Sequence, residues 1–175
     1  MRQEGFGRIE SMKIGIIADT HDNLPNIDKA VKRLNEENAQ LVLHAGDYVA
    51  GFSVLRLKPL KAKVIGIFGN NDGDHPLLTK RFQEINGEIR GAFAEVIVDN
   101  IKIAMVHGDD VGLLNSLIGT QGYDVVVHAH SHEAKIYRVG KTIIINPGEV
   151  CGYLSGKPTF ALLDTKTLGT EIMPV

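Results

Sequence analysis

The chain has little of what marks a secreted, a membrane-bound or a nucleic-acid-binding protein. It holds a single cysteine, Cys151, in 175 residues, which excludes an intrachain disulfide and fits a reducing cytoplasm. No apolar run approaches the roughly 18 to 20 residues that a membrane-spanning helix requires. The first eleven residues have neither the apolar centre nor the small-residue cleavage site of a signal peptide. We therefore expect a cytoplasmic protein that does not associate with membranes.

The chain also lacks a strong charge of either sign, since its formal net charge is −2. It has no basic stripe for nucleic acid, so nucleic acid is expected only as a substrate. No repeat or low-complexity linker interrupts the sequence, and its length suits one domain. We predict a single domain over residues 12–175, preceded by a short, dispensable N-terminal extension, residues 1–11.

Short apolar runs alternate with helical patterns in the first half of the chain. Three of these runs are predicted to be strands buried on both faces: 13–18, 41–44 and 63–68. Helices are predicted from Pro25 to about Asn38, after Ser53 as a cap and ending before Pro59, and from Pro76 to about Ile85. This alternation predicts parallel strands joined by helices.

The second half is richer in strands. Residues 94–98 and 101–106 flank the turn signal Asp99-Asn100 and predict a hairpin. A helix from about Val111 to Gln121, closed by Gly122, and a strand over 124–127 are expected next. The remaining runs predict mostly antiparallel hairpins: 134–139, 141–146, 159–163 and 168–173. The whole pattern predicts an α/β fold, a four-layer αββα sandwich with two mixed β-sheets flanked by helices.

Side chains that could bind metal ions follow the predicted strands one after another along the chain. They are Asp19 and His21, Asp47, Asn70, His107, and His130 and His132. An α/β sheet keeps its ligand sites at strand ends, and this mixed oxygen and nitrogen set suits two borderline-hard divalent ions. In an extended chain, residues two apart point the same way, so Asp19 and His21 are expected to converge on one ion.

These residues resemble the calcineurin-like metallophosphoesterases, and the chain length is similar to that of the small phosphodiesterases of this superfamily. The shared pattern is Asp-x-His, Gly-Asp, Gly-Asn, His and His-x-His, from Asp19 to His132. The resemblance implies the four-layer sandwich and two divalent metal ions, with manganese, nickel, iron or zinc as candidates. It implies one ion held by Asp19, His21, Asp47 and His132, and a second held by Asp47, Asn70, His107 and His130.

The sequence departs from the family pattern at two positions. Ala129 replaces the usual glycine before the His-x-His pair, and Asn71 replaces a histidine that helps the leaving group in the family. An asparagine can donate a hydrogen bond but supplies no proton near neutral pH. We therefore expect a phosphodiesterase for small phosphodiesters, with a metal-bridging hydroxide as nucleophile and weak phosphomonoesterase activity.

Several residues outside the ligand set also have predicted roles, and for some of them the sequence allows an alternative. Asp72 is predicted, with Asn71, to take part in catalysis by orienting a neighbouring histidine; a loop carboxylate facing water is the alternative. Asn23, Asn71 and His75 are predicted to contact substrate, although a solvated loop also explains His75. His44, inside a predicted strand, is expected to be a core histidine rather than a ligand.

The turn Asn146-Pro147-Gly148 is explained by its Pro and Gly, with a substrate-facing role as the alternative. Two rival functions are considered for the chain as a whole. One is a catalytically weak protein-interaction scaffold on the same fold, as in one retromer subunit, but all seven ligand positions here hold ligating side chains. The other is a His-x-His amidohydrolase, which requires a barrel of about 250 residues with the motif after its first strand; this chain is too short and its His-x-His pair comes late in the sequence, which argues against it. The sequence leaves a homo-oligomer open.

Overall fold

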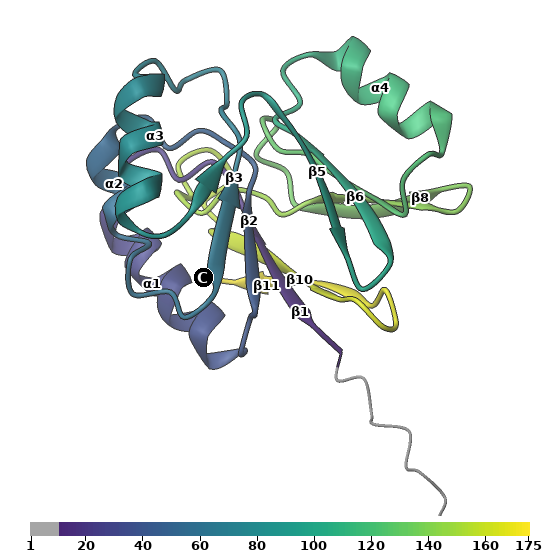
Figure 1. The fold of residues 1–175 in the computed structure, drawn as a ribbon, viewed down its shortest axis with the longest axis horizontal. Coiled ribbons are helices and arrows are strands. Elements are labelled where there is room, and N and C mark those ends of the chain that lie inside the picture. Colours follow the sequence, from purple (N-terminus) through teal and green to yellow (C-terminus); the bar gives the residue numbers. More distant parts are fainter. Residues whose placement is uncertain (1–10) are drawn as a thin grey trace, which may run out of the picture.

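The computed structural model describes residues 11–175, so the prediction of a dispensable extension lies outside the described residues, apart from Ser11. Two sheets pack face to face, with helices on the outer faces (Figure 1). The elements are β1 (Lys13–Ile17), α1 (Leu24–Glu36), β2 (Leu41–His44), α2 (Gly51–Leu55), β3 (Lys63–Gly66), α3 (His75–Glu84), β4 (Glu88–Ile89), β5 (Phe93–Val98), β6 (Ile101–Val106), α4 (Val111–Thr120), β7 (Val125–Val127), β8 (Lys135–Val139), β9 (Thr142–Asn146), β10 (Thr159–Asp164) and β11 (Thr170–Pro174).

Both sheets are mixed, as predicted. The first has the order β11-β10-β1-β2-β3-β4, in which β1 to β4 are parallel and β10 runs antiparallel to β1. The second has the order β5-β6-β7-β9-β8, with β6, β7 and β9 parallel and an antiparallel strand at each edge. The C-terminal hairpin β10–β11 thus joins the first sheet, so the two halves of the sequence do not correspond to the two sheets.

The core has two apolar layers because the central strands of the first sheet, β1, β2 and β3, are buried on both faces. Ile14 and Ile16 of β1 belong to the layer between the sheets, with Ile103 of β6. Val42 of β2 belongs to the layer under the helices, together with Leu34 of α1. Alternate side chains of a strand point to opposite faces, so a continuous apolar run fills both layers.

Helix ends differ from several predictions. Ser53 lies inside α2, whose cap position is Ala50, so the predicted Ser53 cap is wrong. Asp74 caps α3, because its side chain accepts a hydrogen bond from the amide of Leu77. The chain leaves α4 through Gln121, which has a left-handed backbone (φ 48°), instead of through Gly122. The two-residue strand β4 is too short to produce a periodic pattern and was not predicted.

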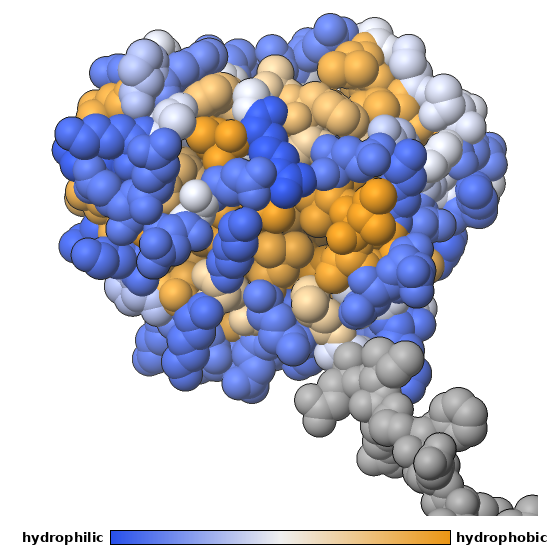
Figure 2. Space-filling view, viewed as in Figure 1, coloured by the Kyte–Doolittle hydropathy of each residue, from blue (hydrophilic) through white to orange (hydrophobic). Residues whose placement is uncertain are grey.

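The fourth layer is one exposed helix, α4, none of whose residues is buried. Apolar surface gathers over α4 and over the edge strand β5 (Figure 2). Val111 of α4 is 61% exposed, and Ile97 of β5 is 68% exposed. Over residues 11–175, the structure contains no helix with the length and hydropathy needed to cross a membrane.

Candidate metal centre

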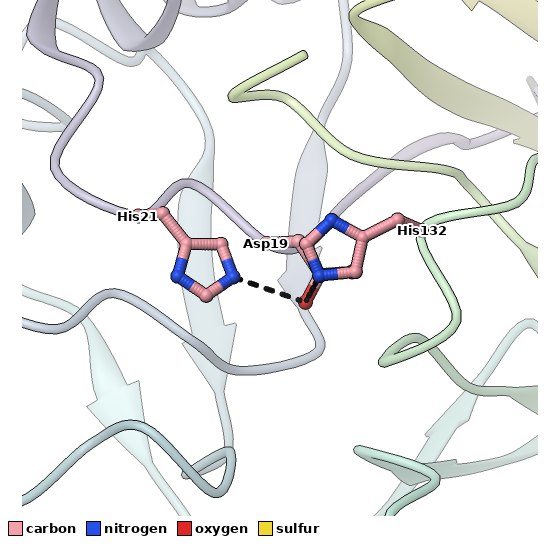
Figure 3. Close-up of side chains that lie close together, drawn as sticks. All are labelled: Asp19, His21 and His132. Carbon is pink, nitrogen blue, oxygen red and sulfur yellow. Dashed lines mark ion pairs between the residues drawn. The ribbon is translucent and has the colours of Figure 1, made fainter. Parts of the chain in front are cut away.

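The predicted metal ligands lie in loops at one end of the two sheets. Asp19 and His21 follow β1, and Asp47 follows β2, in the first sheet. His107 follows β6, and His132 lies beyond β7, in the second sheet. Figure 3 shows His21 and His132 directed at Asp19 from opposite sides. The interface between the sheets therefore ends in a cluster of carboxylates and imidazoles.

Short distances join these side chains into two groups that share Asp19. Asp47 Oδ2 lies 3.4 Å from His21 Nε2 and 3.3 Å from His107 Nε2. Asp19 Oδ1 lies 3.9 Å from the Nε2 atoms of both His21 and His132. Ligand atoms lie within 4.8 Å of one another in Asp19, His21 and His132, and likewise in Asp19, Asp47 and His107. One oxygen of Asp47 thus faces a histidine of each group, as a bridging carboxylate would.

Within residues 11–175, four of the atoms in this cluster are buried and have no hydrogen-bond partner. They are both carboxylate oxygens of Asp19, Nε2 of His21 and Nε2 of His107. Leaving one such group unsatisfied costs about 1–3 kcal/mol, more if it is charged. Carboxylate oxygens and imidazole nitrogens are ligands that manganese, iron, nickel and zinc accept. The donor set therefore fits divalent metal ions, which would satisfy all four atoms at once.

The other two predicted ligands lie beside this cluster. The His130 ring centroid is 5.3 Å from that of His107, and the His130 side chain is exposed. Asn70 lies between Gly69 and Asn71, which both approach Asp47, but its own side chain is exposed. Within residues 11–175, the structure shows no hydrogen bond from the Asn70 amide to another predicted ligand. The prediction that Asn70 is a metal ligand is therefore supported only by its position between two residues that contact Asp47.

The ligand positions have an unusual backbone. Five of the seven have positive φ: Asp19 (49°), His21 (37°), Asp47 (61°), His130 (67°) and His132 (60°). The extended backbone predicted for Asp19 and His21 is therefore wrong, and the two side chains converge through left-handed residues. This conformation costs an L-residue of order 1–2 kcal/mol, and such strain gathers at functional sites.

Backbone hydrogen bonds between neighbouring loops hold this conformation in place. The amide of Asp19 donates to Gly46 O (3.1 Å), and the amide of His21 donates to Asp47 O (3.1 Å). Gly46 has a φ of 97°, and a Cβ there would lie 2.6 Å from the amide nitrogen of Gly69. A Cβ on Gly69 would collide with the Asp47 carboxylate. Both glycines permit this close approach of the two loops.

Asp72 has a different role from the predicted one. Its carboxylate is buried and accepts hydrogen bonds from the amides of Asp47 (2.9 Å), Tyr48 (2.8 Å), Val49 (2.8 Å) and Gly69 (2.8 Å). The predicted histidine partner is wrong, and so is the alternative of a carboxylate facing water. Asp72 instead fixes the loop that carries Asp47 against the loop after β3.

Asn71 and Asn23 use their amides within the fold. Asn71 donates from its backbone to Asp47 Oδ1 (2.9 Å) and from its side chain to Asp47 Oδ2 (2.8 Å). The Asn23 side chain caps α1 by accepting from the amide of Asn26, and it donates to Cys151 O (2.8 Å). These bonds give Asn23 a structural role and do not support the predicted substrate contact. His75 is exposed and stacks on Phe68, with ring centroids 3.7 Å apart.

Two histidines outside the ligand set have partners of their own. His44 is fully buried; its Nδ1 accepts from the Gly46 amide (3.2 Å), and its Nε2 lies 3.4 Å from Thr20 Oγ1. Burial lowers the pKa of His44 to about 3, so this ring is neutral and belongs to the core, as predicted. His128 Nδ1 lies 3.3 Å from Ala129 O.

Burial and mutual contact shift the ligand pKa values in opposite directions. Burial raises the pKa of Asp19 to about 6, although His107 and His132 oppose this shift. Burial alone would lower the pKa of His107, but the close approach of the Asp47 carboxylate (3.3 Å) and its negative charge raise that pKa to about 9. A proton on His107 thus offsets the negative charge of the nearby carboxylates at the place where a metal ion fits. Metal binding must therefore release that proton.

Sequence reasoning missed Glu149, a fully buried carboxylate 2.7 Å from His132 Nδ1. The available signal was its isolation, because it is the only charged residue between Lys141 and Lys157. Hydrogen bonds from Cys151 and His132, with those from Ser155, outweigh burial and lower the pKa of Glu149 to about 2. Glu149 is therefore an anion in contact with a predicted metal ligand.

Asn146 also braces the site. Its amide donates to Ala129 O (3.2 Å) and Ser131 Oγ (2.9 Å), and its side-chain oxygen accepts from the Gly148 amide (3.0 Å). The predicted tight turn is thus present, and Asn146 supports the loop of the His-x-His pair. Ala129 is buried and its amide donates to His107 O (2.7 Å), so the backbone accommodates the missing glycine.

The two packed sheets, with a cluster of potential metal ligands at their ends, are what the resemblance to the metallophosphoesterases implied. The family comparison agrees with this class. Residues 12–168 match the family model of the calcineurin-like phosphoesterase superfamily domain. The chain belongs to this superfamily, as predicted from its motifs. A phosphodiesterase of Methanocaldococcus jannaschii, MJ0936, is 44% identical over 156 residues, which are 89% of this chain and 94% of that protein. The prediction of an enzyme of the phosphodiesterase kind is thereby confirmed.

Other relatives and solved structures extend this result. The phosphodiesterase YfcE of Escherichia coli is 25% identical over 171 residues, 90% of each chain. The solved structure of an archaeal phosphodiesterase matches with a TM-score of 0.90 and 41% identity, covering 94% of this chain and all of that one. Vps29 of Entamoeba histolytica, solved with Zn²⁺, matches with a TM-score of 0.68 and 21% identity, covering 94% and 98%. At that identity the last match shows the fold alone.

Proposed function

We propose that the chain hydrolyses small phosphodiesters with two divalent metal ions. The four buried, unpartnered ligand atoms between the two sheets carry this proposal. One ion would be held by Asp19, His21, Asp47 and His132, and the other by Asp47, Asn70, His107 and His130. When bound, such a pair of ions supplies Lewis acidity and an activated water for in-line attack at phosphorus. Manganese, nickel, iron and zinc are the candidates, because all accept this ligand set.

The residues around Asp47 determine how the leaving group departs. Asn71 bonds both oxygens of the Asp47 carboxylate and so lies at the centre of the site. Its amide can donate a hydrogen bond to substrate but cannot protonate a leaving oxygen. We therefore propose a bias to good leaving groups and weak phosphomonoesterase activity. His75, exposed in the same loop region, is proposed as a further substrate contact.

A matched pair of histidine variants tests the function. His107→Ala removes a ligand of the cluster, whereas His128→Ala removes a neighbouring histidine that we do not assign to a metal. Metal content and hydrolysis of a bis-aryl phosphodiester, an alkyl aryl diester and an aryl monoester are measured for both. We expect His107→Ala to lose metal and activity, and His128→Ala to retain both. Equal activity in the two variants would refute the proposal.

The catalytically weak scaffold remains the second candidate, because Vps29 shares the fold. The ligand cluster of this chain favours the enzyme. Metal analysis of gently purified protein separates the two: about two equivalents of transition metal support hydrolysis, whereas a chain that binds none and hydrolyses no diester is a scaffold.

We also infer the location, the partners and the domain organisation of the chain. We propose a cytoplasmic location, where the single thiol of Cys151 stays reduced, and nucleic acid only as a substrate. The exposed apolar residues Ile97 and Val111 support a homo-oligomer. We also propose that residues 12–175 act as a single domain.

A further inference from the structure

Glu149 lies at the centre of a dense set of hydrogen bonds. The segment that contains it follows β9 and the Asn146-Pro147-Gly148 turn. Its carboxylate accepts from His132 Nδ1 (2.7 Å), Cys151 Sγ (2.9 Å) and the amides of Tyr153 (3.1 Å), Leu154 (3.0 Å) and Ser155 (2.5 Å). All five partners are hydrogen-bond donors, and together they stabilise the buried negative charge of Glu149.

The two ring nitrogens of His132 face different carboxylates. Nδ1 contacts Glu149, while Nε2 lies 3.9 Å from Asp19 Oδ1. An ionised carboxylate only accepts hydrogen bonds, so Nδ1 must carry the proton. In a neutral ring this leaves the Nε2 lone pair free and directed toward Asp19. That is the tautomer that a metal ligand requires.

We propose that Glu149 is a positioning residue that fixes the tautomer and orientation of His132 for metal binding. The ligand role of His132 rests on the proposed function. The same segment also holds Asp19, because the amide of Cys151 donates to Asp19 O (3.0 Å) and the amide of Val150 donates to Ala18 O (3.1 Å). Residues 149–151 therefore set the distance between two ligands of one ion, although those ligands come from different sheets.

The variant Glu149→Gln tests this proposal, with Cys151→Ala as its control. Glutamine has a similar shape, but it cannot accept from His132 through its amide nitrogen. Cys151→Ala removes another donor to the same carboxylate and leaves His132 untouched. Nitrogen-15 NMR of histidine-labelled, metal-free protein reports the tautomer of His132. We expect the Nδ1–H form in the parent chain and in Cys151→Ala, and a substantial Nε2–H population in Glu149→Gln.

Metal affinity provides the second measurement. In competition with a chelator, Mn²⁺ should bind one of its two sites about 10- to 100-fold more weakly in Glu149→Gln, and the other site should change far less. In a His132→Ala background the same substitution should cause no further loss. An equal loss in that background would show that Glu149 acts through the general fold, and would overturn the proposal.

Glu149→Asp covers the case in which glutamine prevents folding. It retains the acceptor, so His132 should keep its Nδ1–H form. The positioning role is refuted if Glu149→Gln keeps the parent tautomer and both parent Mn²⁺ affinities, or if Glu149→Asp converts the ring to the Nε2–H form. If the parent chain binds no metal and hydrolyses no diester, the proposed function fails instead. The tautomer, measured without metal, still decides whether Glu149 orients His132.

Discussion

Two buried aspartates in the same site should respond in opposite ways to the same substitution. Both carboxylate oxygens of Asp19 lack a hydrogen-bond partner among the described residues, whereas the Asp72 carboxylate accepts hydrogen bonds from four backbone amides. Asp19→Asn and Asp72→Asn each exchange one oxygen for an amide group of similar size. The first change removes an unfavourable charge, and the second removes an acceptor that the fold uses.

The magnitudes follow from the structure. Burial raises the pKa of Asp19 from 3.8 to about 6, which corresponds to about 3 kcal/mol of destabilisation when the carboxylate is charged. A raised carboxylate pKa destabilises the folded state above about pH 6, and the cost vanishes below 3.8, where both states are protonated. At pH 7.5, Asp19→Asn should therefore stabilise the metal-free chain by about 1–3 kcal/mol. Asp72→Asn should destabilise it by about 2–6 kcal/mol, because two amides lose an acceptor at about 1–3 kcal/mol each.

Urea unfolding of chelator-treated protein at pH 7.5 measures both free energies. The experiment is repeated with Mn²⁺ present, where the parent chain should gain stability and Asp19→Asn should gain far less. Destabilisation of the metal-free chain by Asp19→Asn would refute the reasoning, because it would mean that the carboxylate stabilises the fold without a cation. Native Asp19 is thus expected to reduce stability in exchange for metal binding.

Three further outcomes are expected. Asn71→His should raise turnover of diesters with poor leaving groups more than turnover of activated aryl diesters; an equal change for both classes, measured by steady-state kinetics, would contradict a role in protonation. The pKa of His44 is lowered to about 3, so its neutral ring contributes fully to the free energy of unfolding above pH 6.5, and this contribution is lost as the pH falls. The free energy of unfolding should decrease by about 2 kcal/mol between pH 7.5 and pH 5 because of this group. Urea unfolding of His44→Asn, which can still accept from Gly46, should show a correspondingly weaker pH dependence, and an unchanged one would exclude His44 as the cause. Metal at 100 times its Kd should stabilise the parent chain by about 2.7 kcal/mol per site, and a melting temperature that does not change with metal would contradict the site.

The sequence predicted most of the strands and the order of the ligands, because both depend on local patterns. The run from Ile14 to Ile17 is apolar and buried on both faces, which suffices to identify a buried central strand. Asp47 and His107 each follow such a strand, so the sequence pattern alone predicts their place at a sheet end. Convergence of the two sheets then brought the residues together.

Hydrogen-bond partners could not be predicted in the same way. Asp72 binds amides 23 to 25 residues away, and Asn23 binds the carbonyl of Cys151, 128 residues away. The left-handed backbone of Asp19 and His21 is held by residues after β2, and nothing in the local sequence specifies it. Glu149 belongs to the same group, because only folding brings it to His132. Long-range contacts therefore decide the details of the site.

The attachment of β10 to β1 has a consequence for biosynthesis. Every predicted ligand lies between residues 19 and 132, yet β1 finds its antiparallel neighbour only in residues 159–164. A nascent chain that has already exposed all its histidines still lacks the strand that completes the first sheet. We expect metal loading to occur only after residues 159–164 have been synthesised and have paired with β1. A fragment ending near residue 135 should accordingly contain a full set of ligands and bind metal poorly.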